Sequence, residues 1–379
     1  MPTAKNIVFC ADGTWNGPDE DENKDGVPDI TNVLKLFLIL QGDNTWASIR
    51  LKNEQEKVLT VGNENVQIAK YIHGVGDSDN PVLRILGGAF GAGIIARIVR
   101  GHTYISRNYV SGDRIFIAGF SRGAYTARAL AGLICSEGLL DASQYDLEDR
   151  ELAYTLATSA WRSYREKAAN RSPIESLKHS LLNAVGRLPG FFRLPIASEQ
   201  TVAAPVECVA VWDTVGSLGI PVFDQQGDSL DLFRFADENL GGKVRFGLHA
   251  VSLDERRINF PPTLWTSRAG ITQLAFPGAH ADVGGGYPSV KKESGLSDIA
   301  LEWMIAQLKT KGLLFGDAPR EVAPDPHGVL HTPWAEGLFG ALPDKARSWD
   351  RKYGLAEHDS IHKRVEANIG YAPTNRIPR

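Results

Sequence analysis

The chain has 379 residues, of which 43% are hydrophobic and 23% are charged, a composition typical of globular proteins. It excludes disordered, collagen-like and coiled-coil chains. The net charge of −4 gives no basic excess to attract nucleic acid, and the cysteines are too few and too scattered for a disulfide scaffold or a cysteine-rich zinc site: Cys10, Cys135 and Cys208.

The sequence also argues against a secretory signal and a membrane span. The apolar residues after Lys5 are too few for the core of a signal peptide. The longest weakly polar run, residues 85–96, is shorter than the roughly 20 residues that a membrane span needs. We therefore expect a protein that is not integral to a membrane, is cytoplasmic as encoded and keeps its cysteines reduced.

Short apolar runs predict strands that alternate with helices along the chain. In order, the sequence predicts a strand over 5–11, a helix over 31–40, a strand over 66–72, a helix within 83–110, a strand over 114–118, a helix over 124–134, strands over 206–212 and 272–276, and a helix over 296–309. This alternation is typical of an α/β fold with a mostly parallel central sheet flanked by helices.

Two further segments interrupt this alternation. Residues 142–200 are predicted to be mostly helical, and residues 316–379 are rich in Pro, Gly, His and Trp and are predicted to be irregular. We therefore expect a single domain over residues 1–379, with a helical cap inserted at 142–200.

Four residues suited to catalysis stand at the carboxyl ends of predicted strands: Asp12, Ser121, Asp213 and His280. Ligands of open α/β sheets bind at this edge. The shared position of these residues is the main sequence evidence for an active site.

Ser121 occupies the centre of a G-x-S-x-G motif, Gly119-Phe120-Ser121-Arg122-Gly123, between a predicted strand and a predicted helix. In a nucleophile elbow the turn is so sharp that the residues two before and two after the serine must be small. The backbone N–H of Arg122 would then be one oxyanion donor, at the positive end of the helix dipole. The alternative is a glycine-rich turn in which Ser121 only caps the helix.

A serine nucleophile needs a base and an acid that orients the base. In α/β-hydrolases the acid follows the serine in the chain and precedes the histidine. Asp213 ends the strand 206–212 and fits this order, although an aspartate there also caps turns. Asp282 is a rival acid, but its place two residues from His280 favours folding the loop or lining the pocket.

His280 is the favoured base because it follows the strand 272–276 in a glycine-rich loop that lets the backbone approach the site closely. A loop histidine is otherwise often a surface residue. The competing bases are His249 and His362.

The segment Asp12-Gly13-Thr14 closes the first strand. In this fold the loop after an early strand gives the second oxyanion donor, and Gly13 or Thr14 is placed to supply it. Asp12 either holds this loop or lies in the pocket. A simple Asp-Gly turn is an equally good interpretation.

Several motifs in this order resemble one family of α/β-hydrolases. They are FCADGTWNG with TNVLKL, GVGDSDN, GDRIFIAGFSRGAYTARALAGLI, VWDTVGSLG and FPGAHADVGGGY. The family is bacterial and fungal and includes the phospholipase effectors of type VI secretion in the first lipase-effector class. The resemblance covers roughly residues 5–300 and is specific because five motifs recur in order.

This resemblance implies an α/β-hydrolase fold and a triad of Ser121, Asp213 and His280. It also implies ester hydrolysis, with phospholipid as the best-known substrate class, and export by a secretion system that needs no signal peptide. Fold alone does not fix the substrate.

An acidic segment has the D-x-N-x-D-G spacing of a calcium loop, in which oxygen ligands alternate and Gly26 permits a sharp bend. The twelfth position is Asn32 instead of the bidentate glutamate of an EF-hand. The candidate ligands of a structural Ca2+ are Asp21, Asn23, Asp25 and Asp29. The alternative is a solvated acidic loop, and catalysis itself is expected to need no cofactor.

The apolar segment 188–196 places Phe191 and Phe192 between Pro and Gly turns. It is either a lid that makes peripheral contact with a membrane or a cap that packs on the core, and we favour the cap.

Taken together, the residues predict a serine esterase that cleaves lipid or phospholipid acyl esters. The alternatives are a hydrolase of small soluble esters with no lipid interface and a non-catalytic, hydrolase-like binding protein.

Overall fold

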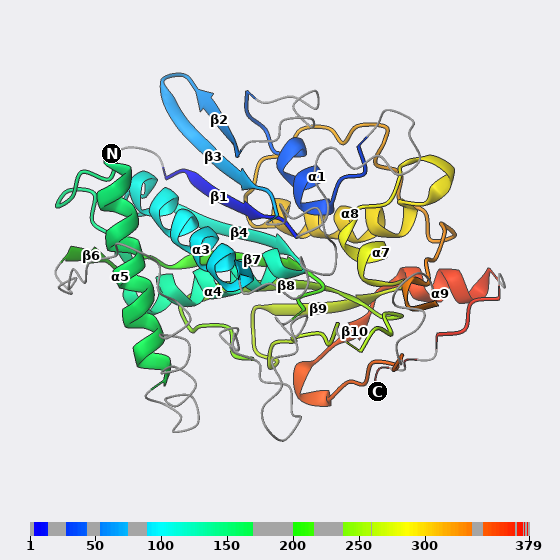
Figure 1. Cartoon of the computed structure of the whole chain (residues 1–379). Helices are drawn as coiled ribbons and strands as arrows, with labels where there is room; N and C mark the ends of the chain where they lie inside the picture. Colours follow the sequence, from blue (N-terminus) through cyan, green and yellow to red (C-terminus); the bar gives the residue numbers. More distant parts are fainter. Residues whose placement is uncertain are drawn as a thin grey trace.

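The structure is a computed structural model that describes residues 4–13, 28–43, 54–74, 89–169, 200–215, 238–258, 260–335, 344–367, 370–373, 375 and 377. Its centre is an eight-stranded sheet in the order β10-β9-β8-β7-β4-β1-β3-β2 (Figure 1). Neighbouring strands are parallel, apart from the antiparallel pair of β2 and β3. The predicted α/β fold with a mostly parallel sheet flanked by helices is confirmed.

The strands of this sheet are β1 (Asn6–Ala11), β2 (Gln55–Val61), β3 (Glu64–Ile72), β4 (Arg114–Phe120), β7 (Val206–Trp212), β8 (Val244–Ser252), β9 (Ile271–Phe276) and β10 (Ala356–Glu357). A small antiparallel pair is formed by β5 (Leu139–Leu140) and β6 (Thr201–Val202). The α-helices are α1 (Asn32–Ile39), α3 (Ala89–Asn108), α4 (Arg122–Glu137), α5 (Arg150–Ala169), α7 (His280–Gly284), α8 (Gly295–Thr310) and α9 (Asp359–Glu366). Three short 3-10 turns cover Val290–Lys292, Pro333–Ala335 and Arg351–Tyr353.

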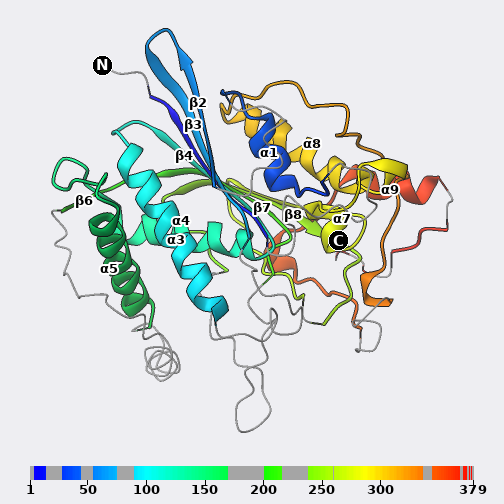
Figure 2. The ribbon, with the colours of Figure 1, turned by 45° about the horizontal axis from the view of Figure 1, so that its top comes forward.

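Helices cover both faces of the sheet, as Figure 2 shows with α1 and α8 on one side and α3, α4 and α5 on the other. Successive side chains of a strand point to opposite faces. In β1, Val8 and Cys10 therefore pack into the core under α1 and α8, whereas Ile7 and Phe9 pack into the core under α3 and α4. Burial on both faces explains why this strand reads as a continuous apolar run.

The sequence located most of these elements. Strand 206–212 is β7 with the same bounds, and helix 31–40 is α1, whose N-cap Thr31 accepts a hydrogen bond from Leu34 N at 3.3 Å. Among the described residues, five strands were missed: β2, β8 and β10 of the central sheet and the two-residue strands β5 and β6. β2 is an edge strand with several exposed residues, and β8 carries Gly247 and His249 within its run. The segment 316–379, predicted to be irregular, contains β10 and α9.

The predicted cap insertion 142–200 is described only in part. Its helix α5 packs on α3 and α4, and Ala160 and Trp161 join the core beneath those helices. Residues 170–199 lie outside the described residues, and so do Phe191 and Phe192. The role of the insertion as a cap, and the single domain over 1–379, therefore stay predictions. Within the described residues, every helix is too short or too polar to cross a membrane.

The order of the strands places the topological switch point of the sheet at β1 and β4. After β1 the chain continues to β2 and β3 on one side, and after β4 the central sheet continues with β7 on the other. Ligands of such sheets bind beside the switch point, at the carboxyl ends of the strands. The residues that directly follow these two strands are Asp12 and Ser121.

Candidate active site

Ser121 lies in the sharp turn between β4 and α4. Its φ is 56° and its ψ is −120°, a backbone conformation that costs a non-glycine residue about 1–3 kcal/mol. The flanking glycines make the turn possible. A Cβ on Gly119 would collide with the backbone of Gly123, and a Cβ on Gly123 would collide with the carbonyl of Ala11. The Ser121 side chain does not cap α4, so the helix-capping interpretation does not hold.

Asp213 directly follows β7, the strand that neighbours β4, just as Ser121 directly follows β4. The register pairs Phe120 with Trp212, so Ser121 and Asp213 emerge side by side from β4 and β7. Asp213 also has a positive φ, of 34°. Among the described residues only two other non-glycine residues, Lys291 and Lys292, have a positive φ. Two of the predicted site residues, Ser121 and Asp213, thus have a strained backbone conformation.

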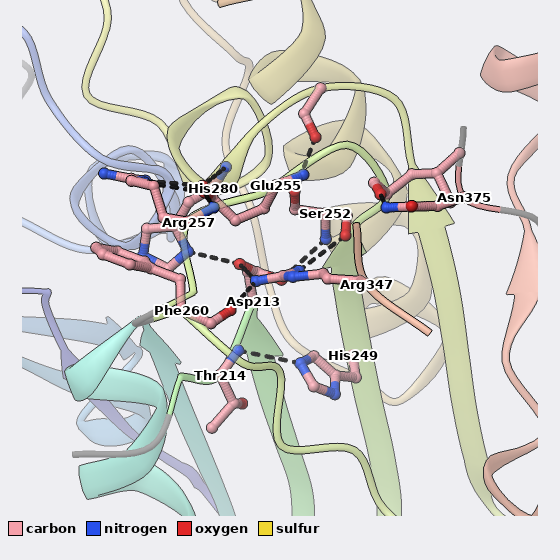
Figure 3. A network of polar contacts seen from close by, with 12 residues as sticks. Asp213, Thr214, His249, Ser252, Glu255, Arg257, Phe260, His280, Arg347 and Asn375 are labelled. Atoms are coloured by element: carbon pink, nitrogen blue, oxygen red, sulfur yellow. Dashed lines mark hydrogen bonds and ion pairs between the residues drawn. The ribbon is translucent and has the colours of Figure 1, made fainter. Parts of the chain in front are cut away.

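His280 is the first residue of the short helix α7, directly after the loop that follows β9. The sequence placed it in a loop and did not foresee this helix. Its Nδ1 lies 2.5 Å from Asp213 Oδ2 (Figure 3). Its backbone N–H donates to Glu255 Oε2 at 3.1 Å. The imidazole ring packs between Phe120 and Phe260, with ring centroids 4.5 and 5.1 Å away.

The Asp213 carboxylate is fully buried and accepts hydrogen bonds on both oxygens. Oδ1 accepts from Ser252 N at 2.9 Å and from Arg347 Nη1 at 2.7 Å. Oδ2 accepts from Arg347 Nη2 at 2.9 Å as well as from His280. Arg347 was not predicted from the sequence. It stands in a segment without periodicity, and no motif marks it.

The electrostatics of the pair suit a neutral base beside an ionised acid. Burial opposes ionisation of Asp213, but the charge of Arg347 and the contact with His280 outweigh it and hold the pKa of the carboxyl well below its usual range. Burial lowers the pKa of His280, and the contact with Asp213 only partly offsets this. At neutral pH the imidazole is therefore uncharged, which is the form that accepts a proton.

Ser121 and His280 are both almost buried, at 7% and 6% exposure. Among the described residues, no hydrogen bond joins Ser121 Oγ to His280. Contacts between a nucleophile and its base are often long without substrate and tighten in the complex. What links the two residues here is Phe120, which directly precedes Ser121 and packs against the His280 ring at an interplanar angle of 34°.

The loop after β1 lies against Ser121. A Cβ on Gly13 would lie 3.4 Å from Ser121 Cβ. The Gly13 N–H donates to Asp12 Oδ1 at 2.6 Å, so this donor would have to leave Asp12 in order to bind an oxyanion. Thr14, the alternative donor, lies outside the described residues.

Asp12 is itself buried and holds this loop. Its carboxylate accepts from Tyr71 Oη at 2.6 Å and from Thr31 Oγ1 at 2.7 and 2.8 Å. These bonds tie the end of β1 to β3 and to the start of α1. Burial raises the pKa of Asp12 in spite of these donors.

Arg122 begins α4, so its backbone N–H lies at the positive end of the helix dipole. Burial, together with the charge of the neighbouring Arg97, lowers the pKa of its side chain to about 9.

Asp282 does not contact His280 in the way Asp213 does. Its carboxylate accepts from Ala279 N at 2.9 Å, from His331 N at 3.1 Å and from His331 Nδ1 at 2.6 Å. It therefore folds the loop that carries His280 and fastens a later segment to that loop.

The competing histidines lie elsewhere. His249 is buried within β8, where its Nε2 accepts from Thr214 N at 3.2 Å and its Nδ1 faces Gln273 Oε1 at 3.3 Å. Burial lowers its pKa to about 3. His362 is exposed on α9 and faces Glu357. Neither is placed to contact Ser121.

The candidate calcium ligands Asp21, Asn23 and Asp25 lie outside the described residues, whereas Asp29 is described and buried. Within the described part of the chain, no cluster of three or more His, Cys, Asp or Glu side chains is arranged to hold a metal ion.

Comparison with known proteins places these residues in a family. The family model described as "T6SS, Phospholipase effector Tle1-like, catalytic domain" matches residues 5–307. The chain is 28% identical, over 272 residues, to the "Uncharacterized protein YEL023C" of Saccharomyces cerevisiae. The aligned region covers 72% of this chain and 34% of the yeast protein. The chain thus spans about a third of the length of this curated relative.

Two solved structures are similar to this chain at low identity. An uncharacterised protein from Pseudomonas aeruginosa is 20% identical, with a TM-score of 0.48 over 86% of this chain and 48% of that chain. The Tle1 effector bound to the VgrG spike of the type 6 secretion system is 19% identical, with a TM-score of 0.39 over 76% of this chain and 52% of that chain.

Proposed function

The chain belongs to the family of catalytic domains of Tle1-like phospholipase effectors of type VI secretion, and from this premise we propose that it hydrolyses acyl esters of phospholipids. In this proposal Ser121 is the nucleophile, His280 the general base and Asp213 the acid that orients His280. Export through a type VI secretion apparatus, which needs no signal peptide, and peripheral contact with a membrane are part of the same proposal.

The observation that carries the proposal is the contact of 2.5 Å between His280 Nδ1 and Asp213 Oδ2, beside a strained serine turn. A structural Asp-His pair needs no such neighbour. Strain persists only where the surrounding fold over-determines it, and it concentrates at functional sites. That both Ser121 and Asp213 have a positive φ supports a shared catalytic role.

The chemistry follows from these positions. Asp213 accepts a hydrogen bond from the Nδ1–H of His280 and does not take the proton, which leaves Nε2 as the basic nitrogen. Nε2 takes the proton of Ser121 Oγ while Oγ bonds to the acyl carbon. The tetrahedral intermediate then expels the alcohol, which receives that proton from His280. Water, deprotonated by the same nitrogen, attacks the acyl-serine. The bond between Oγ and the acyl carbon breaks, His280 returns the proton to Ser121 Oγ, and the fatty acid leaves.

The negative oxygen of the intermediate needs donors. The N–H of Arg122 at the start of α4 is the first, and Thr14 is the second that we favour because the Gly13 N–H already bonds to Asp12. One such donor contributes on the order of 3–4 kcal/mol to stabilising the transition state.

The test measures fatty-acid release from phospholipid vesicles and hydrolysis of a short-chain nitrophenyl ester by the same preparation. Wild type should release fatty acid, and Ser121→Ala should lose both activities by several orders of magnitude while keeping its melting temperature. Activity on the soluble ester alone would favour the small-ester alternative. If a folded wild type is inactive on both substrates, the chain is a hydrolase-like binding protein.

A further inference from the structure

Arg347 comes from outside the residues that the family model matches, which end at 307, yet its side chain is only 5% exposed and lies on Asp213. Its Nη1 donates to Asp213 Oδ1 at 2.7 Å and to Ser252 O at 2.8 Å. Its Nη2 donates to Asp213 Oδ2 at 2.9 Å and to Phe260 O at 2.7 Å. Figure 3 shows the guanidinium beside the carboxylate on the side away from His280.

Arg347 lies in a short segment, residues 344–349, that is held by contacts at both ends. At one end Asp344 pairs with Arg256 Nε at 2.6 Å, and Lys345 N donates to Arg256 O at 2.8 Å. At the other end Trp349 is buried in a small apolar core with Val251 and Leu264. The position of the guanidinium is thus set by the fold and not by Asp213 alone.

We propose that Arg347 is a positioning residue for the Asp213–His280 pair, so that the segment beyond the family-matched residues completes the active site. This inference rests on the proposed function. A bidentate contact fixes the plane of a carboxylate as well as its charge. With Arg347 absent, Ser252 N and His280 would be the hydrogen-bond donors left to Asp213 among the described residues, and the carboxylate could rotate away from Nδ1.

Arg347 also balances charge. A carboxylate stabilises the imidazolium beside it and so raises the pKa of that histidine. Burial is the main reason why the pKa of His280 is lowered, and of the other charged groups around the ring Arg257 lowers this pKa and Glu255 raises it. Arg347 acts on it through Asp213, because it neutralises part of the charge of that carboxylate. Removing Arg347 should therefore raise the pKa of His280 at the same time as it loosens the geometry.

The alternative is that Arg347 only anchors its own segment, through the carbonyls of Ser252 and Phe260. Such a role predicts less folded protein, but unchanged kinetics per folded molecule. Positioning predicts a lower kcat with a similar KM, and a pH profile that moves.

The experiment compares Arg347→Met and Arg347→Lys with wild type and with Arg351→Met, a control in which a nearby exposed arginine is removed. All are assayed on a short soluble ester, with melting curves for each. We expect Arg347→Met to lower kcat by about tenfold to a hundredfold with little change in KM, and to shift the acidic limb of kcat/KM to higher pH. Arg347→Lys should lie between, and Arg351→Met should match wild type.

Wild-type kcat and an unmoved pH profile in folded Arg347→Met would overturn the inference. If that variant does not fold, Arg347→Lys and the rescue of Arg347→Ala by free guanidinium, far below unfolding concentrations, decide in its place. Recovery of activity by Arg347→Ala in free guanidinium supports the positioning role. No recovery in Arg347→Ala, together with wild-type kinetics in Arg347→Lys, contradicts the positioning role. An inactive wild type removes the proposed function and this inference together, whereas an active wild type with an inactive Ser121→Ala isolates the failure to Arg347.

Discussion

His280 Nδ1 lies 2.5 Å from Asp213 Oδ2 although 67 positions separate the two residues in the chain. The parallel sheet brings them together, because β7 and β9 both end at the edge where β4 delivers Ser121. The contact is buried, and it is the feature on which the proposed chemistry depends.

The first prediction separates the histidines. His280→Ala should lose activity by orders of magnitude because it removes the proposed base. His362→Ala changes an exposed side chain on α9 and should match wild type in activity.

His249→Ala removes a buried partner of Thr214 N and should lower the free energy of unfolding by about 2–4 kcal/mol. Its activity per folded molecule should largely survive. Rates and urea melts measure both effects. An active His280→Ala alongside an inactive but folded His249→Ala would reverse the assignment.

The second prediction concerns pH. Burial lowers the pKa of His280 below its ordinary value, which is about 6.5. Since the neutral imidazole is the base, kcat/KM should rise with pH through a midpoint below about 6.5 and be level at neutral pH. A pH–rate profile on a soluble ester measures this. A midpoint above neutrality would show that His280 is not held neutral by its surroundings, or that another group titrates.

The third prediction concerns calcium. If Asp21, Asn23, Asp25 and Asp29 hold a structural ion, EDTA should lower the melting temperature but leave turnover well below that temperature nearly unchanged. The reason is that a ligand of the folded state stabilises it by mass action. The double variant Asp21→Ala with Asp25→Ala should melt early and no longer respond to EDTA. Equal melting of wild type with EDTA and with added calcium would leave a solvated acidic loop.

The fourth prediction concerns the lipid interface. If Phe191 and Phe192 touch lipid, their burial contributes about 1.5–3 kcal/mol each, and activity should rise when substrate passes from monomers to vesicles. The double variant Phe191→Ser with Phe192→Ser should then lose vesicle binding but retain hydrolysis of a soluble ester. Val61→Ser, at an exposed position on the β2–β3 hairpin, is the matched control. A parallel loss of both activities would identify the segment as a structural cap.

Sequence patterns located the parts of the fold that depend on local signals. β7 was found with its own bounds because VECVAVW is apolar except for Glu207 near its start. β8 was not predicted because Gly247 and His249 interrupt its apolar pattern. Both residues are nevertheless accommodated by the core, where His249 accepts a hydrogen bond from Thr214 N and packs against Trp265. Such a strand is recognisable only once its neighbours are known.

The residues of the candidate site likewise divide into those that a local sequence pattern marks and those that only a tertiary contact identifies. Ser121, Asp213 and His280 carry local marks, namely a G-x-S-x-G motif and strand ends with glycines nearby. Arg347 carries none, since it stands 134 positions from Asp213 in a segment without a repeating pattern. Its role comes from tertiary contact, as does the bond between Gly13 N and Asp12 that changes the choice of oxyanion donor.

The nucleophile is tested most directly by treating wild type and Ser121→Ala with a fluorophosphonate probe and locating the adduct by mass spectrometry. The probe reacts with a serine that an adjacent base activates. The account predicts one adduct, on Ser121 Oγ, that is absent from Ser121→Ala and much reduced in His280→Ala. Labelling of a different residue, or equal labelling of wild type and Ser121→Ala, would contradict it.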